Sequence, residues 1–353
     1  MKFLKRDYKR VVIMLGAACN MKCDYCIQRF QKPPTLPNQI NLDIFDFLDE
    51  VTKESPGVDI RFYGGEPTLY FDHIQKIAAH LGANHNYSIL TNGKAVTEEM
   101  TTLFNTYGMF VSVSWDGEAT KETRHEDVLA QNENLIKIEN LMVEAVISSK
   151  CYPKEFLEAL EPYDKRYFAM HGHHIWAGMD FIVDSGIPKQ DLSYSLDSGR
   201  LYAELADLLD GYHEAEENPE KAWPIRDNLM RGYRRAILEE KEAAPWTPCG
   251  SGFSMLNLDL QGNLYACHNT FHRIGDIYDD YFSVLSGAIM ADPTIEDEET
   301  CKNCPAKKWC SGGCRLARSS KKALESQCKL NKAVDWAFRD AAKKYGWKTT
   351  KGE

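Results

Sequence analysis

The stretch LGAACNMKCDYC, residues 15–26, contains three cysteines within eight positions. Cys19, Cys23 and Cys26 follow the spacing C-x3-C-x2-C. A structural zinc site is normally closed by four ligands, whereas a cubic four-iron, four-sulfide cluster takes one protein ligand per iron. Three thiolates would therefore leave one iron open to bind another molecule. Zinc held by these cysteines and a distant fourth ligand is the alternative.

A second group of cysteines lies beyond residue 248. Its members are Cys249, Cys267, Cys301, Cys304, Cys310, Cys314 and Cys328. The chain has 11 cysteines, an odd number, and we accept no secretion signal, so a disulfide framework is disfavoured. Clustered thiols indicate metal or iron–sulfur binding. A zinc knuckle formed by residues 301–314 would leave the other three cysteines of this group unexplained.

Composition limits the classes of partner. The 353 residues are 43% apolar, enough for a sizeable core, and the net charge is -10. An acidic chain is unlike proteins that bind nucleic acid or membrane surfaces through a basic face. The apolar run before Cys19 is short and its leader contains Asp7, so a lipoprotein signal is disfavoured. We expect a cytoplasmic protein with an unprocessed N-terminus, no membrane partner and no nucleic acid.

The first half of the chain alternates strands and helices. Strands are predicted at VVIML (11–15), VDIRFY (58–63), YSILT (87–91), MFVSVS (109–114), LMVEAVISS (141–149) and HIWAGMDFIV (174–183). Strand–helix repeats imply a parallel sheet, open or closed into a partial barrel, with function at the carboxyl ends of the strands. We predict a first domain at 1–195, a helical connection at 196–243 and a cysteine-rich domain at 244–353.

Four motifs in this order resemble the radical S-adenosylmethionine (SAM) enzymes. They are C-x3-C-x-aromatic-C with Tyr25 as the aromatic, GGEP at Gly64, Gly65, Glu66 and Pro67, TNG at 91–93 with Asn92, and SWDG at 114–117. The resemblance covers about residues 1 to 190. It implies a partial (β/α)6 TIM-like barrel whose open iron chelates SAM, and whose 5′-deoxyadenosyl radical abstracts hydrogen from a substrate.

The resemblance also implies contacts to SAM. The GGEP strand end would meet the methionine amino group, and backbone near Tyr25 would meet the adenine edge. Ser114 and Asp116 would lie near the ribose or the carboxylate, and Arg124 would pair with the carboxylate. Glu66 has a second interpretation, as a carboxylate that starts a helix.

The order of the C-terminal cysteines resembles the SPASM extension of radical SAM enzymes that act on peptides and proteins. The resemblance assigns Cys301, Cys304, Cys310 and Cys328 to an outer auxiliary four-iron cluster, and Cys249, Cys267 and Cys314 to an inner one. Three clusters are then expected, and the inner one has an open iron unless Cys151 supplies the eighth ligand that two auxiliary clusters need. We interpret Cys151 as a spare buried thiol.

The expected function is hydrogen abstraction from a residue of a peptide or protein, giving a cross-link, thioether, epimerisation or oxidation. Alternatives are oxidation of Ser or Cys as in anaerobic sulfatase-maturating enzymes, radical modification of a small molecule or nucleotide, and a redox relay without radical chemistry. His268 follows Cys267 where the sulfatase maturases have Asp, and we predict it as a catalytic base; tuning of the cluster is its other interpretation. Expected partners are flavodoxin or ferredoxin as electron donor and, since the first strand begins near residue 11, a separate leader-binding protein.

Overall fold

The computed structural model describes residues 8–30, 39–182, 195–239, 249–269, 271–291, 299–319 and 321–349. Its strands are β1 (Arg10–Met14), β2 (Asp59–Tyr63), β3 (Asn86–Thr91), β4 (Phe110–Ser114), β5 (Leu141–Ile147), β6 (Trp176–Phe181), β7 (Met255–Asp259), β8 (Asn263–Tyr265) and β9 (Arg273–Asp276). They form one nine-stranded sheet in the order β6-β5-β4-β3-β2-β1-β7-β8-β9.

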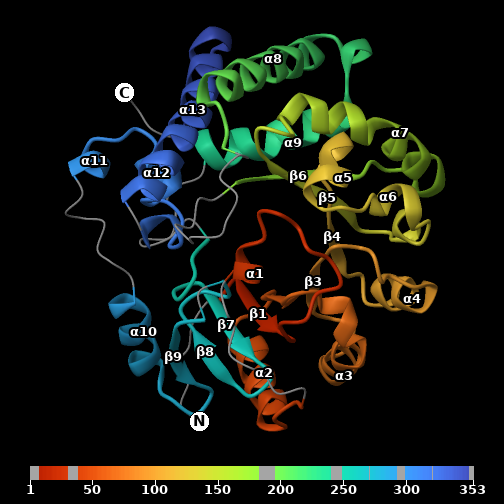
Figure 1. The fold of residues 1–353 in the computed structure, drawn as a ribbon, viewed down its shortest axis with the longest axis vertical. Coiled ribbons are helices and arrows are strands. Elements are labelled where there is room, and N and C mark those ends of the chain that lie inside the picture. The colour runs from red at the N-terminus through yellow and green to blue at the C-terminus, as the bar shows by residue number, and fades with distance from the viewer. Residues whose placement is uncertain are drawn as a thin grey trace.

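The helices are α1 (Ile27–Phe30), α2 (Asp43–Glu54), α3 (Phe71–Leu81), α4 (Glu98–Thr106), α5 (Thr120–Thr123), α6 (Val128–Gln131), α7 (Pro153–His171), α8 (Ser198–Glu217), α9 (Pro224–Arg234), α10 (Tyr281–Met290), α11 (Glu299–Lys302), α12 (Lys307–Cys310) and α13 (Lys321–Tyr345). Helices α2, α3, α4 and α7 lie on the outer side of this sheet, whereas α11 and α12 lie apart from it (Figure 1). Shorter turns are the 3-10 helices η1 (Pro67–Tyr70), η2 (Gly117–Ala119), η3 (Leu135–Lys137), η5 (Pro219–Lys221) and η7 (Ala317–Ser319), and the π-helix η6 (Arg235–Glu239).

Strands β1 to β6 pair in parallel with sequential neighbours, as the strand–helix alternation predicts. The helix ends follow local signals. Thr97 caps α4 by accepting a hydrogen bond from the Met100 N–H, and α7 begins at Pro153 and ends at Gly172, which has a left-handed φ of 74°. The predicted α/β barrel fold is confirmed.

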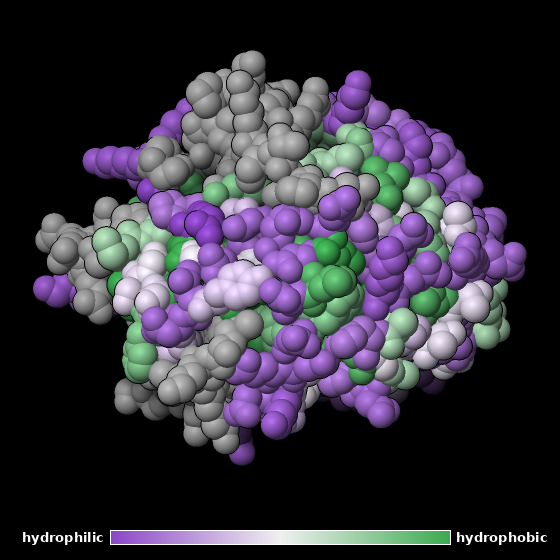
Figure 2. Space-filling view, turned by 90° about the horizontal axis from the view of Figure 1, so that it is seen from below, coloured by the Kyte–Doolittle hydropathy of each residue, from purple (hydrophilic) through white to green (hydrophobic). Residues whose placement is uncertain are grey.

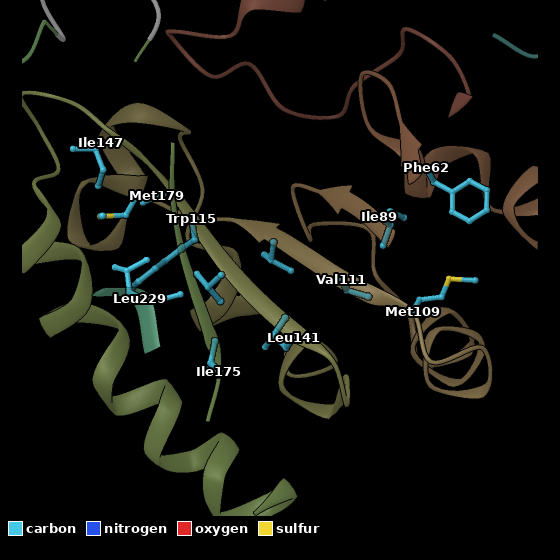
Figure 3. Packing of buried hydrophobic residues seen from close by; sticks show 14 of the residues in the cluster. Phe62, Ile89, Met109, Val111, Trp115, Leu141, Ile147, Ile175, Met179 and Leu229 are labelled. Carbon is cyan, nitrogen blue, oxygen red and sulfur yellow. The ribbon is translucent and has the colours of Figure 1, made fainter. Parts of the chain in front are cut away.

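The main core lies between the strands and the helices packed against them. In Figure 3, Val111, Leu141 and Ile175 approach from adjacent parts of the sheet, and Leu229 of α9 lies near Trp115 and Met179. These side chains alternate along each strand, as in β5, where every second residue is buried. The opposite face of each strand is thereby left for the barrel interior, where the polar residues of the strands lie.

The sheet continues into the C-terminal part of the chain. Strand β7 pairs in parallel with β1, with Arg10 opposite Met255 and Met14 opposite Asp259. The predicted hairpin is present, because β7 and β8 pair antiparallel around a turn in which Gly262 has a φ of 83°. Near the top of Figure 1, α13 packs along α8. The predicted domain limits stay a prediction, and the junction at residues 243–244 lies outside the described residues.

The surface seen in Figure 2 is mostly hydrophilic, and its hydrophobic residues are divided among separate patches. Separate apolar side chains are normal on a protein surface. Within the described ranges, no helix combines the length and apolar character needed to cross a bilayer.

Candidate iron–sulfur and S-adenosylmethionine site

The loop with the first three cysteines is held against the end of β2. The Gly65 N–H donates to Gly16 O at 2.9 Å, and the Glu66 N–H donates to Ala18 O at 2.8 Å. A Cβ at Gly65 would lie 2.4 Å from Ala18 O, which is backbone that cannot move aside cheaply. Only glycine lets the two segments approach this closely, so the GGEP motif positions the cysteine loop at the carboxyl end of the sheet.

The three thiols share one electrostatic environment. Burial raises the pKa of Cys19 and raises that of Cys23 to about 11, although Arg124 opposes the shift at Cys23. The thiol of Cys26 contributes to both increases. Thiolates here therefore need a nearby positive charge, which iron ions supply. Among the described residues, no three His, Cys, Asp or Glu side chains are arranged to hold a single metal ion.

Asn92 links the cysteine loop to β3. Its side-chain Nδ2 donates to Asn20 Oδ1 at 2.8 Å and lies 3.7 Å from the sulfur of Cys19. Its backbone N–H donates to Glu66 Oε2 at 2.7 Å. The predicted cofactor residue Asn92 thus lies at the cysteine loop, and its cofactor contact stays a prediction.

Glu66 is almost fully buried and is occupied by protein donors. Its Oε1 accepts hydrogen bonds from the Thr68 N–H, the Thr68 hydroxyl and the Thr91 hydroxyl. Burial raises its pKa, and these donors oppose the increase. This geometry matches the alternative interpretation, a carboxylate at the start of η1, with Pro67 as the first residue of that turn. Glu66 thus joins the ends of β2 and β3 beneath the cysteine loop.

Asp116 is the centre of a buried polar network and has no exposed side-chain surface. It accepts hydrogen bonds from Arg124 Nε and Nη2, both at 2.9 Å, from the Thr123 hydroxyl at 2.7 Å, from the Tyr25 hydroxyl and from the Val146 N–H at 3.0 Å. Burial disfavours the charge of Arg124, but the neighbouring Asp116 carboxylate outweighs this effect and raises the pKa of Arg124. Both side chains therefore have protein partners, whereas the sequence interpretation placed them on SAM.

This network connects the cysteine loop to the ends of β4 and β5. The Arg124 guanidinium also lies over the Tyr25 ring, 5.4 Å from its centroid. Tyr25 comes from the cysteine loop, Asp116 from the end of β4 and Val146 from β5, so one carboxylate ties three segments together. Ser114, at the end of β4, is half-buried, and its contact with SAM stays a prediction.

Replacing Asp116 by Asn should destabilise the fold by about 3–5 kcal/mol, because the buried Arg124 charge loses its partner. Unfolding of the metal-free protein in urea under anaerobic conditions measures this loss. The matched control is Asp207→Asn on the exposed face of α8, which should change stability by less than about 0.5 kcal/mol. A change below about 1 kcal/mol in Asp116→Asn would show that the network carries little of the stability.

The second cysteine group divides into two sets. The Cys267 thiol has a pKa raised to about 12 by burial, with Cys249 and Cys314 adding to the increase. The Cys310 thiol has a pKa raised to about 11, again mainly by burial, and its cysteine neighbours are Cys328, Cys304 and Cys301. These sets are the same as the inner and outer ligand sets expected from the SPASM resemblance, and their cluster ligation stays a proposal. Asp116 and Glu155 are charged neighbours of Cys151, which is buried.

The inner cysteine set is connected to the SAM side of the barrel. The Tyr63 hydroxyl donates to Asn269 Oδ1 at 3.1 Å, and Gln28 Nε2 donates to the same oxygen at 3.3 Å. Gln28 lies in α1, two residues after Cys26, and Asn269 lies two residues after Cys267. One amide oxygen therefore joins the two cysteine loops, with the ring of Tyr63 between them.

His268 lies beside Tyr63, with ring centroids 4.5 Å apart and an edge-on angle of 72°. Its Nδ1 is 3.0 Å from Asn257 Oδ1. Burial, together with the charges of Arg61 and Arg10, lowers its pKa to about 4, so the ring is neutral at pH 7. The predicted base is thus located at the barrel interior and next to Cys267.

The hydrogen-bond network of Asn257 determines which nitrogen of His268 carries the proton. The Ser251 hydroxyl donates to Ala266 O at 2.7 Å, and Asn257 Nδ2 donates to Ser251 Oγ at 2.9 Å and to Tyr265 O at 3.3 Å. Carbonyl oxygens only accept, so Asn257 must turn its Oδ1 toward His268, and His268 Nδ1 must donate. His268 Nε2 is then the unprotonated nitrogen, as a proton acceptor requires.

Sequence reasoning missed the supporting residues Ser251, Asn257 and Tyr63. Asn257 shares one face of β7 with Asp259, and Tyr63 shares one face of β2 with Asp59 and Arg61, so both lie on the polar face that strand alternation directs to the interior. That alternation was the signal from which they could have been found.

Comparisons with known proteins agree with this site. Residues 13–171 match the family model "Radical SAM superfamily". Residues 13–171 therefore form a radical SAM domain, and the chain carries a further cysteine-rich part that this model does not cover.

The similarity to known proteins extends over most of the chain. It is 24% identical over 358 residues to the cysteine-type anaerobic sulfatase-maturating enzyme of Clostridium perfringens, covering 90% of each chain. The solved structure titled "Native anSMEcpe with bound AdoMet and Cp18Cys peptide" has a TM-score of 0.66 and 19% identity, covering 95% of this chain and 99% of that one. Streptococcus suis SuiB bound to precursor peptide SuiA has a TM-score of 0.60 and 18% identity, covering 89% and 73%. The match confirms the expected fold through the C-terminal, SPASM-type part.

Proposed function

We propose that this enzyme modifies a residue of a peptide or protein substrate through a radical step, producing a post-translational modification. Two of its structural neighbours are titled as complexes with peptides, the Cp18Cys peptide and the precursor SuiA. A cytoplasmic location and electron supply by flavodoxin or ferredoxin belong to the same proposal.

The residues present fit the cofactors that this function needs. Cys19, Cys23 and Cys26 would hold the cluster that binds SAM, because the loop presents three thiols at the strand ends. The two C-terminal cysteine sets would hold auxiliary clusters, giving three clusters in total. When bound, the first cluster and SAM supply a 5′-deoxyadenosyl radical that removes hydrogen from an unactivated carbon.

The observation that carries the proposal is the junction of the two cysteine loops at Asn269. Its Oδ1 accepts from both Tyr63 and Gln28, so the inner cysteine set and the SAM loop face the same interior space. A substrate in this space would lie between the site of hydrogen removal and the inner auxiliary site. His268, with Nε2 unprotonated, lies beside Tyr63 and would take the proton that the substrate loses when a new bond or double bond forms.

Oxidation of Ser or Cys, as named for the sulfatase-maturating relative, is the second candidate. The similarity over 90% of each chain favours it. His268, where those enzymes have Asp after the corresponding cysteine, disfavours it.

The decisive experiment is co-expression with the short peptides encoded beside the gene, followed by mass spectrometry. We expect one peptide to change mass only when the enzyme is present, and the purified enzyme to form 5′-deoxyadenosine from SAM with that peptide. A synthetic cysteine peptide of the sulfatase type is the second arm, and its conversion to an aldehyde would select the second candidate. SAM cleavage without modification of any peptide or protein would refute the proposal.

A further inference from the structure

Two carboxylates on neighbouring strands face the barrel interior and are not used in the steps described above. They are Glu144 of β5 and Asp180 of β6. Val146 is paired with Asp180, and Glu144 is paired with Gly178. Strand residues two apart point to the same face, so the two carboxylates are diagonal neighbours on the interior face.

Gly178 provides the room for this arrangement. A Cβ at this position would lie 2.0 Å from Met142 Cε and 3.3 Å from Glu144 Cγ. The missing side chain lets Glu144 extend over β6 toward Asp180. Glu144 Oε2 accepts a hydrogen bond from the Ser112 hydroxyl at 2.9 Å, which holds its carboxylate in place.

The arginines on the interior face of β1 and β2 are paired with Asp59. Arg10 pairs with Asp59 at 2.7 Å, and Arg61 lies 3.6 Å from the same carboxylate. Among the described residues, neither arginine forms an ion pair with Glu144 or Asp180. Within the part of the chain that the structure describes, the Asp180 side chain has no hydrogen bond or ion pair, and it is accessible to solvent.

The groups around Asp180 come from several elements. Although the side chain is open to solvent within the interior, the surrounding atoms of the barrel desolvate it and are the largest cause of an increase in its pKa to about 7; Glu144 on β5 adds to the increase and Arg61 on β2 opposes it. Tyr63 on β2 and Tyr233 on α9 lie near enough to interact with its charge, and the Tyr233 hydroxyl donates to Met179 O. No ammonium or guanidinium group of the described residues forms an ion pair with Asp180.

We propose that Asp180 and Glu144 form a substrate subsite that binds a cationic side chain, lysine or arginine, of the peptide that enters the barrel. This inference rests on the proposed function, because it assumes a peptide substrate. Asp180 is the second-last residue of β6 and therefore lies close to the carboxyl end, where ligands bind in barrels of this type. Charge-assisted hydrogen bonds to a partly buried carboxylate are among the stronger polar contacts in proteins.

The test uses two probes that differ only in charge, N-acetyl-lysine methylamide and N-acetyl-norleucine methylamide. Equilibrium dialysis against the reconstituted, SAM-bound enzyme under anaerobic conditions measures both affinities. We expect the lysine amide to bind about tenfold more tightly at pH 8, a factor that corresponds to one charge-assisted contact. The preference should shrink at pH 6, where a carboxyl with a pKa of about 7 is mostly protonated and the lysine keeps its charge.

Asp180→Asn and Glu144→Gln should abolish or reduce this preference, whereas Asp207→Asn, an equal charge change on exposed α8, should retain it. Equal binding of the two amides to the wild-type enzyme, or an unchanged preference in Asp180→Asn, would overturn the subsite. So would a loss of SAM affinity in Asp180→Asn, which would assign the carboxylate to SAM instead. These outcomes leave the proposed peptide modification standing, since that is judged separately by mass spectrometry of the peptides.

Discussion

Simultaneous replacement of Cys19, Cys23 and Cys26 by alanine is expected to remove about 4 of about 12 irons per chain and to abolish SAM cleavage. All three thiols come from one loop between β1 and α1, and the cysteines that affect the pKa of Cys19 and Cys23 lie in this loop. The auxiliary cysteine sets come from β8, α11, α12 and α13 and the loops beside them, so they should still bind iron. Only the site that activates SAM is lost.

Iron and sulfide analysis of the anaerobically reconstituted variant, together with chromatography of 5′-deoxyadenosine, measures both effects. Cys151→Ala is the matched control. Cys151 is a buried thiol with charged neighbours that belongs to neither auxiliary set. The iron content of the Cys151→Ala variant should therefore equal that of the wild type. Stoichiometric zinc with little iron in the wild-type protein would contradict the cluster assignment. Retained SAM cleavage in the triple variant would contradict the role of this loop.

Much of the fold could be predicted because its strands and helices have clear local patterns. Val11 to Met14 form a continuous buried run, and Leu141 to Ile147 alternate between core and interior, so both read as strands. The parallel pairing follows because a helix lies between each strand and the next. The cysteine spacings were informative for a similar reason, since a cluster requires particular ligands at short range in the chain.

The pairing of β7 with β1 could not be predicted from these patterns. It joins Arg10 to Met255, and backbone pairing between segments so far apart leaves no periodic signal in either of them. A hairpin was expected at this position, but its place in the sheet depends on the completed barrel. This pairing brings Asn257, and through it His268, to the interior next to Val12.

The partners of the acidic residues were also beyond sequence reasoning. Asp116 and Glu66 stand in motifs that suggest direct cofactor contact, yet the fold surrounds each with protein donors. A buried carboxylate takes whichever donors the tertiary structure supplies, and those donors come from other strands. The motifs therefore indicated where the site lies, whereas the protein partners of these carboxylates depend on the tertiary structure, and their contacts with the cofactor stay a prediction.

The interior of the barrel has two chemically different sides. On one side, Tyr63 and His268 lie next to the two cysteine loops. On the other side, the carboxylates of Glu144 and Asp180 are diagonal neighbours on β5 and β6. Arg61 interacts with groups on both sides, since it affects the pKa of His268 and of Asp180. A substrate held by the acidic side would present its reacting carbon toward the other, where hydrogen and proton removal are proposed.

His268→Gln is expected to lower the yield of finished product by about a hundredfold or more while 5′-deoxyadenosine still forms. Glutamine keeps nearly the size of the ring and can donate to Asn257 Oδ1, but it has no basic nitrogen at the position of Nε2. The substrate would then lose its hydrogen atom normally and fail at the later proton transfer. Asn257→Ala should have a smaller effect of the same kind, because it removes the acceptor that fixes the His268 tautomer.

The measurement is the ratio of product to 5′-deoxyadenosine, determined by mass spectrometry with the peptide identified by co-expression. His272→Gln is the matched control, an exposed histidine on the same segment, and its ratio should equal that of the wild type. Iron content separates the two interpretations of His268. A full complement of iron with a low ratio supports the base, and loss of about 4 irons would assign His268 to support of the inner cluster. A normal ratio of product to 5′-deoxyadenosine in His268→Gln would refute the role of His268 as the base, because another group would then be taking the proton.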